Sequence, residues 1–170
     1  MNPEKLKESL QGEFEEEIQE IELEKQKAGV SEDHVYEIWV ELPKESIREV
    51  ISYLREFQYP HLTVISGGDT GEDHLDLVYH LSIGYGEKGG EVMINLRTTV
   101  SKANPTIPTI TDLIPGSSTT EREMHEFLDV TFEGTPDSRH LFLPDDMEVH
   151  PWRKDEEELE EQINRLDKQP

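Results

Sequence analysis

Histidine is the residue type in this sequence best suited to metal chemistry, and two of the seven histidines share a suggestive spacing. His74 and His80 lie six positions apart in a stretch of alternating hydrophobicity, so both side chains would fall on one face of a strand. Neither has an acidic or histidine partner at a recognisable ligand spacing, and we therefore interpret the stretch as ordinary sheet. The other histidines are scattered and form no motif: His34, His61, His125, His140 and His150.

Two loops contain residue types that bind ions in other proteins. The run from Asp69 to Asp73 resembles half of a calcium loop, but its glycine is misplaced and no glutamate closes a loop of the required length. The glycine-rich run Gly84–Gly90 lacks the Gly-Lys-Ser/Thr of a phosphate-binding loop, and no helix start follows it. We predict a turn for the first run and a hairpin loop for the second.

Residues for nucleophilic or acid–base catalysis do not form a recognisable set. The sequence has no Gly-x-Ser-x-Gly turn and no cysteine. Asp145 and Asp146 are adjacent, so their side chains would point apart in an extended segment. The sequence therefore predicts no catalytic residue, no metal site and no cofactor-binding residue in this chain.

Composition narrows the classes of partner. The 170 residues include 39 acidic and 16 basic side chains, which give a formal net charge of −23. Such a surface repels nucleic acid and anionic lipid, and favours a basic partner surface or simple solubility. Without cysteine there is no thiolate for an iron–sulfur cluster. No apolar run exceeds three residues, so we expect a soluble, intracellular chain. The abundance of glutamate is compatible with a thermophilic source.

Hydrophobic periodicity predicts the elements. Residues 1–29 read as one amphipathic helix, whose acidic face (Glu13, Glu15, Glu16, Glu20, Glu22 and Glu24) we interpret as solvated in preference to an acidic binding site. Residues 30–115 alternate with period two in four stretches, and Pro43–Phe57 has a helical apolar stripe. We expect an α+β fold: a two-layer domain with a mixed or antiparallel four-stranded sheet, a long N-terminal helix and an extended C-terminal arm.

The C-terminal third differs from the rest. Thr109 with Asp112, and Thr120 with Glu123, have the spacing of helix N-cap pairs. Residues 116–155 then read as a short helix followed by an extended arm broken by Pro136, Pro144 and Pro151. The arm is too apolar for a solvated linker. Two interpretations stay open: a tail folded back on its own domain, or an arm laid on another protein. We predict that residues 130–170 add little to the stability of the domain formed by residues 30–115. Residues 156–170 read as an acidic helix or a disordered tail.

Four short runs in this region resemble a known signature. Glu121-Arg122-Glu123, Phe132–Arg139, Leu143–Asp146 and Pro151–Asp155 are similar to the C-terminal signature of the thirty-kilodalton (NuoC-like) subunit family. That family occurs in respiratory complex I and in membrane-bound, energy-converting [NiFe] hydrogenases. In the family, Asp and Gly usually follow Glu-Arg-Glu shortly afterwards, whereas this chain has Glu126 and Asp129. It has Thr135 in place of the usual histidine, and Asp137-Ser138-Arg139-His140 in place of Asp-Leu-Arg-Arg. We interpret the chain as closer to the hydrogenase branch.

The resemblance implies a cofactor-free accessory subunit in the peripheral arm of a complex I-like, membrane-bound oxidoreductase, on the cytoplasmic side of the membrane. It implies partners of two kinds, the hydrogenase-large-subunit-like (49-kilodalton-type) subunit and iron–sulfur subunits, and the membrane is reached only through them. Iron–sulfur clusters, and in hydrogenases a [NiFe] centre, would belong to those partners. The residues that match the signature, or that are of hot-spot type, are our candidates for partner binding: Glu121, Arg122, Glu123, Phe132, Pro136, Asp137, Arg139, Leu143, Pro144, Pro151, Trp152, Arg153 and Lys154.

Two other functions remain as alternatives. The first is the same scaffold role in a complex I relative that reduces a quinone or a sulfur compound, since the acceptor site would lie in a different polypeptide. The second is a free-standing acidic protein-binding module with no connection to redox chemistry. Identification of the proteins that purify with the native chain distinguishes the second alternative from the others.

Overall fold

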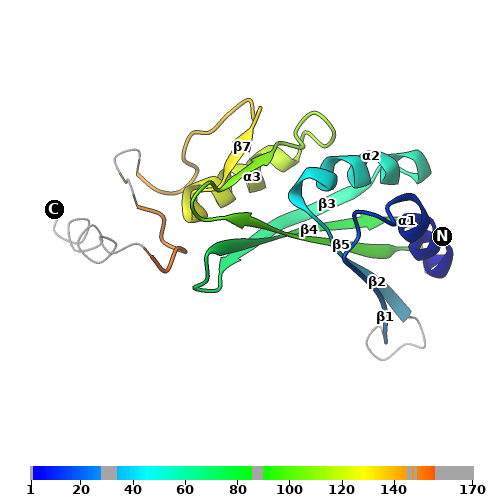
Figure 1. The fold of residues 1–170 in the computed structure, drawn as a ribbon. Coiled ribbons are helices and arrows are strands. Elements are labelled where there is room, and N and C mark those ends of the chain that lie inside the picture. The colour runs from blue at the N-terminus through cyan, green and yellow to red at the C-terminus, as the bar shows by residue number, and fades with distance from the viewer. Residues whose placement is uncertain (1, 28–33, 86–89, 145–146, 148, 156–170) are drawn as a thin grey trace.

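A five-stranded sheet forms the centre of the computed structural model, which describes residues 2–27, 34–85, 90–144, 147 and 149–155 (Figure 1). Its strands are β1 (Glu20–Lys27), β2 (His34–Glu41), β3 (His61–Asp69), β4 (His74–Ile83) and β5 (Val92–Ser101). They lie in the order β1-β2-β5-β4-β3. Only β2 and β5 run parallel, and every other neighbouring pair is antiparallel. The predicted mixed sheet in an α+β fold is confirmed, with one strand more than expected.

One face of the sheet is covered by helices because alternate strand residues are apolar. Leu75, Leu77 and Tyr79 of β4 are fully buried, as are Ile47 and Leu54 on the apolar stripe of α2 (Ile47–Phe57). A short 3-10 turn, η1 (Lys44–Ser46), precedes that helix. Each fully buried aliphatic side chain contributes roughly 1.5–3 kcal/mol to stability. The predicted core of strands and one covering helix is therefore present.

The predicted N-terminal helix is shorter than expected. Helix α1 (Pro3–Glu13) starts as predicted, with Pro3 in its first turn and the Asn2 side chain accepting the N–H of Lys5 at 3.2 Å. It ends at Glu13, and residues from Glu20 onwards form β1, so one helix over residues 1–29 is wrong. Pairing with β2 explains the change: Ile21 and Leu23 alternate toward the core, whereas Glu20, Glu22 and Glu24 are exposed. The predicted stop at Gly29 lies outside the described residues.

A second, smaller sheet ties the C-terminal third to the domain. Strands β6 (Thr106–Pro108) and β7 (Thr131–Glu133) pair in parallel, with Ile107 opposite Phe132 and both side chains buried. Helix α3 (Ser117–Leu128) connects them, and the arm then leaves at the end of the molecule opposite to α1 (Figure 1). The sequence analysis missed both short strands. The predicted acidic helix or tail at 156–170 lies outside the described residues.

The longest helix in the described part of the chain is α3, with 12 residues. Within that part, no helix has the length and apolar character needed to cross a membrane.

Candidate partner-docking site

Helix α3 is the element on which the signature residues are assembled. It packs against β3 at Gly67, where a Cβ atom would lie 2.7 Å from Leu128 Cδ1 and 2.8 Å from Met124 Sδ. The predicted N-cap at Thr120 is wrong, because the helix begins at Ser117 and the Thr120 hydroxyl donates to the Ser117 carbonyl. At the other end, Asp129 adopts a left-handed conformation with φ of 61°, and its N–H donates to the His125 carbonyl. Glycine adopts that conformation without strain, which fits the glycine usual near this point in the resembled family.

Glu121, the first signature residue, is buried and serves this chain's own fold. Its carboxylate accepts from the Thr109 hydroxyl at 2.6 Å, the Ile110 N–H at 2.8 Å and the Ser117 hydroxyl at 3.1 Å. Burial raises the pKa of Glu121, although these donors oppose the rise. The side chain therefore fixes the segment before α3 and, at 1% exposure, presents nothing to a partner. The predicted cap pair at Thr109 and Asp112 opens no helix, because Thr109 donates to Glu121 and Asp112 binds Arg48.

Arg122 holds the middle of the arm. Its guanidinium donates to the carbonyls of Arg139 and His140 at 2.7 and 2.8 Å, and it lies 3.5 Å from the Asp137 carboxylate. Arg139 donates twice to the same carboxylate, and this hydrogen bonding lowers the pKa of Asp137. The Arg139 side chain nevertheless remains 83% exposed. Arg122 thus has a structural role, while Arg139 lies at the surface.

Glu126 holds the next part of the arm. Its carboxylate accepts the backbone N–H groups of Leu141 at 3.1 Å and Phe142 at 3.0 Å, and also that of Leu143. Burial alone would raise the pKa of Glu126, but these three N–H donors hold it below its ordinary value. Three consecutive amides bound to one carboxylate fix the local path of the chain. The sequence analysis did not include Glu126 among the site residues.

The end of the described arm is attached at two further points. The backbone N–H of Trp152 donates to the backbone carbonyl of Phe127 at 3.0 Å, and the two aromatic rings stack with centroids 4.4 Å apart. The Lys154 N–H donates to the Asp69 carboxylate at 2.8 Å, and the Lys102 ammonium group binds that same carboxylate at 2.8 Å. Asp69 also accepts from the Gly71 N–H, so the run at Asp69–Asp73 is a turn, as predicted. Arg153 pairs with Asp155 at 2.6 Å.

The arm therefore divides into a buried part and an exposed part. Val130, Phe132, Met147 and Val149 are buried against this chain, so we now expect the arm to contribute to its stability, contrary to the sequence-based expectation. Phe142 and Trp152 are 69% and 43% exposed. Together with Phe127, which stacks on both, they form what we call the aromatic patch.

The other predicted site residues divide in the same way. Phe132 is buried, and Arg122 is largely covered. Those that are exposed or half-exposed lie on α3 or along the arm: Glu123, Pro136, Asp137, Arg139, Leu143, Pro144, Pro151, Arg153 and Lys154. Sequence reasoning missed Phe127 and Phe142 as site residues. The available signal was Phe142 itself, an aromatic residue at the centre of the apolar Leu141–Leu143 run.

The cavity between α3 and the β7 region is small. It measures about 40 Å³ and is lined by residues of α3 and of the loop after β7, including Arg122, His125 and Thr135. Ligand pockets usually measure about 300 Å³ or more. The surface around α3 thus suits a protein partner better than a small molecule.

The histidines do not gather around a common point. His80 hydrogen-bonds Ser66 and Asn95, each at 2.8 Å, while His74 faces Glu72 and Asp76. Across the described residues, no three His, Asp or Glu side chains are close enough to share one metal ion.

Known proteins match this chain over most of its length. The model of the family described as respiratory-chain NADH dehydrogenase, 30 Kd subunit, matches residues 40–162. The chain is 34% identical over 129 residues to the membrane-bound hydrogenase subunit beta of Pyrococcus furiosus, covering 74% of this chain and 73% of that one. It is 33% identical over 125 residues to NADH-quinone oxidoreductase subunit 5 of Thermus thermophilus, covering 69% and 60%. It is 32% identical over 132 residues to the C/D subunit of Phocaeicola vulgatus, covering 77% of this chain but only a quarter of that one.

Two solved structures share the fold. A trypsin-resistant fragment of Nqo5 superposes with a TM-score of 0.58 at 25% identity, covering 81% of this chain and 99% of the fragment. A chain of the membrane-bound sulfane sulfur reductase, an archaeal respiratory membrane complex, superposes with a TM-score of 0.69 at 24% identity, covering 96% and 91%. The resemblance found in the C-terminal signature is confirmed, and the chain belongs to the family of the 30 Kd subunit of respiratory-chain NADH dehydrogenase.

Proposed function

We propose that this chain is a cofactor-free scaffold subunit, which docks a hydrogenase-large-subunit-like protein and iron–sulfur subunits in the peripheral arm of a complex I-like oxidoreductase. One observation carries the proposal: the arm is attached to α3 by its backbone while it presents Phe142, Trp152 and Arg139 outward. Tryptophan and arginine are enriched among the side chains that dominate interface energies.

Ordering of the arm before binding supports this role. A free, flexible segment loses conformational entropy when it binds, which weakens association. Here Glu126 and Arg122 already bind the backbone of residues 139–143 in the single chain. Binding of a partner then restricts mainly the exposed side chains, so less conformational entropy is lost. More of the free energy gained by burying the aromatic patch therefore contributes to affinity.

The redox groups belong, in this proposal, to the partners. Iron–sulfur clusters are held by cysteine thiolates, and the 170-residue sequence has no cysteine. The chain would hold the redox subunits in fixed geometry without making or breaking a bond itself. We expect it to lie peripherally on the cytoplasmic side of the membrane and to reach the bilayer only through other subunits.

Within the family, we place this chain with the energy-converting [NiFe] hydrogenases. The departures from the respiratory signature at Glu126, Asp129 and Thr135 support this branch. The second candidate is the same scaffold role in a quinone- or sulfur-reducing complex. It is favoured by the fold shared with a chain of the sulfane sulfur reductase complex.

Purification of the tagged chain from membranes of its native cells tests the proposal. Mass spectrometry should identify a hydrogenase-type large subunit and cysteine-rich subunits, and the complex should contain iron. The chain expressed alone should be colourless and hold no stoichiometric nickel, iron or zinc. Recovery of the chain without redox subunits would support the free-standing binding module instead. Nickel in the complex, with hydrogen evolution, distinguishes the hydrogenase from the second candidate.

A further inference from the structure

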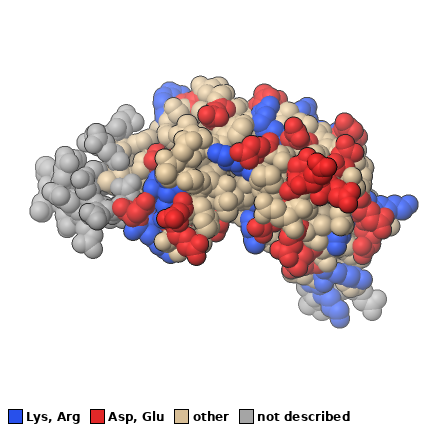
Figure 2. Space-filling model, viewed as in Figure 1, with Lys and Arg blue, Asp and Glu red and all other residues tan. Residues whose placement is uncertain are grey.

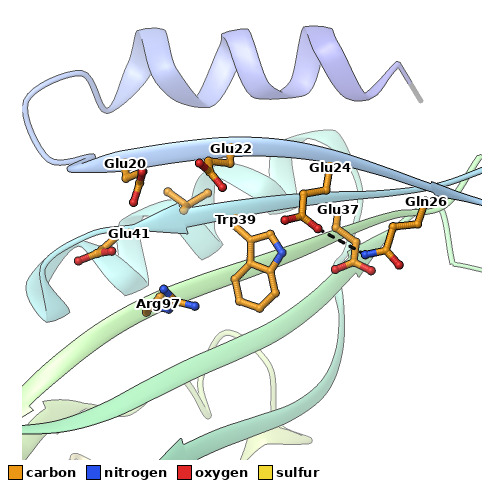
Figure 3. Close-up of a pocket in the computed structure, with 9 residues that line it drawn as sticks. Glu20, Glu22, Glu24, Gln26, Glu37, Trp39, Glu41 and Arg97 are labelled. Atoms are coloured by element: carbon orange, nitrogen blue, oxygen red, sulfur yellow. Dashed lines mark hydrogen bonds between the residues drawn. The ribbon is translucent and has the colours of Figure 1, made fainter. Parts of the chain in front are cut away.

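The strongest feature outside the arm is an acidic groove on the open face of the sheet (Figure 3). Ile38 of β2 is buried beneath the helices, so its neighbours Glu37 and Trp39 point to the opposite face, as does Glu41. The groove has a volume of about 310 Å³, and it lies across β1, β2 and β5. Its lining residues are Glu20, Glu22, Glu24, Gln26, Glu37, Trp39, Val40, Glu41 and Arg97.

The strand register places like charges directly opposite each other. Glu20 pairs with Glu41, and Glu24 pairs with Glu37, on neighbouring antiparallel strands. Like charges directly opposite each other destabilise a sheet. Between the two pairs lies Trp39, opposite Glu22. The fold therefore maintains two repulsive pairs around one aromatic ring.

The described residues hardly neutralise this groove. None of these five glutamates forms an ion pair with another residue in the described part of the chain, and Glu24 accepts only a 3.4 Å hydrogen bond from Gln26. The basic residue that lines the groove is Arg97, whose guanidinium lies 5.3 Å from the centre of the Trp39 ring. In that contact the face of the Trp39 ring already meets a cation.

Geometry and charge restrict what could fill the groove. A single metal ion fits poorly, because no three acidic or histidine side chains among the described residues are close enough to share one. Nucleic acid and anionic lipid are repelled. The two glutamate pairs are four residues apart along the strands, which at a rise of about 3.4 Å per residue makes a separation of about 14 Å. Two lysines or arginines four residues apart in an extended chain have the same spacing.

We propose that this groove binds an extended basic segment of another protein, with two Lys or Arg side chains four residues apart on the two glutamate pairs. Trp39 then contacts the residues between them. This surface is separate from the aromatic patch, since it is built by β1, β2 and β5 and not by α3 and the arm. It would therefore provide a second docking surface, selective for cationic segments.

Binding of defined peptides by the purified chain tests the proposal. The probe is a fluorescein-labelled extended peptide of threonine and valine with two lysines four residues apart. The first comparison peptide has its two lysines adjacent, and the second has glutamines in their place. At low salt we expect the spaced probe to bind at least fivefold more tightly than the adjacent probe, and the glutamine peptide not to bind. Equal affinity of the two lysine peptides would overturn the proposed geometry.

A charge-matched pair of variants separates the groove from net charge. The groove variant combines Glu20→Gln, Glu24→Gln, Glu37→Gln and Glu41→Gln, and the control combines Glu8→Gln, Glu15→Gln, Glu16→Gln and Glu56→Gln at exposed positions elsewhere. We expect the spaced probe to bind the groove variant at least tenfold more weakly, and the control less than threefold more weakly. The groove variant should melt no earlier than the parent, because repulsion has been removed. Equal weakening in both variants would show that only overall charge attracts the peptide.

Discussion

The Glu126 carboxylate accepts the backbone N–H of Phe142 at 3.0 Å, so a buried acid of α3 holds the backbone of the residue whose large hydrophobic side chain is the most exposed among the described residues. The contact spans 16 positions and joins the fold of the free subunit to the surface proposed to bind a partner. Acidic side chains gather over the part of the molecule that contains α1 and α2, and uncharged surface is more extensive toward β7 (Figure 2).

Glu126→Ala should loosen the arm. The change removes a charged acceptor from three backbone N–H groups, and hydrogen bonds to charged groups contribute about 1.5–3 kcal/mol each before non-additivity. We expect unfolding to become easier by about 2 kcal/mol or more, measured by urea denaturation, with faster hydrogen exchange at residues 141–143. Glu123→Ala on the same helix is the control, with an expected change within about 0.5 kcal/mol. Unchanged exchange at those amides would show that Glu126 does not hold the arm.

The hydrogen bond between the Lys154 backbone N–H and the Asp69 carboxylate should weaken as the pH falls. Burial would raise the pKa of Asp69, but Lys102 and the N–H groups of Lys154 and Gly71 lower it to about 2. An unfolded aspartate has a pKa of about 3.9. The folded pKa is the lower one, so the stabilisation is complete above about pH 4 and is lost as the pH falls toward 2. Asp69→Asn should therefore be less stable than the parent at pH 5, and the gap should close by pH 2. A gap that stays constant across this range contradicts the assignment.

Gly67→Ala tests the close packing of α3 against β3. The new Cβ would lie 2.7–2.9 Å from the side chains of Leu128, Met124 and Leu77, all of which are buried and cannot easily move away. We expect a loss of about 1–2 kcal/mol in the free energy of unfolding. Gly68→Ala is the matched control, because nothing lies within 4 Å of its Cβ position, and it should change stability by less than about 0.5 kcal/mol. Similar losses in both variants would show that the strand backbone, and not α3 packing, is responsible.

Arg139 and Trp152 should behave differently in the free chain. Arg139 forms an exposed ion pair with Asp137, and such pairs contribute little to stability, so Arg139→Ala should leave the melting temperature nearly unchanged. Trp152 stacks on Phe127, so Trp152→Ala should cost about 1 kcal/mol before any partner is present. Both should weaken association with the large-subunit-like partner. An early-melting Arg139→Ala that still assembles normally would place Arg139 in the fold and not at the interface.

Local patterns predicted the elements whose residues decide their own conformation. Strict alternation in β4 and β5 and the apolar stripe of α2 are visible without tertiary information. Residues 18–23 were ambiguous, because Ile18 and Ile21 fit a helix while Ile21 and Leu23 fit a strand. Pairing of β1 with β2 decided between them. The strands β6 and β7 are short and pair only with each other, so no local period marks them.

The candidate site was predictable as a segment but not as a surface. The composition and signature of residues 116–155 located the arm. Which arm residues are buried and which are exposed, however, depends on contacts between positions that are distant in the sequence. Glu126 with residues 141–143 and Asp69 with Lys154 are such contacts, the second across 85 positions. An arm laid on a partner and a tail folded back looked like alternatives in the sequence. In the structure the backbone of the arm is attached to its own domain and selected side chains are left exposed. Contact of these exposed side chains with a partner is our proposal.

The most direct measurement is the affinity of Phe142→Ala for the purified large-subunit-like partner, compared with that of Tyr85→Ala. Both residues are exposed, at 69% and 63%, but Tyr85 lies in the β4–β5 hairpin loop, away from the arm. We predict that Phe142→Ala weakens association by about 2 kcal/mol, or about 30-fold, and that Tyr85→Ala leaves association unchanged. Equal affinity of the two variants for the partner would contradict the proposal that the aromatic patch is the docking surface.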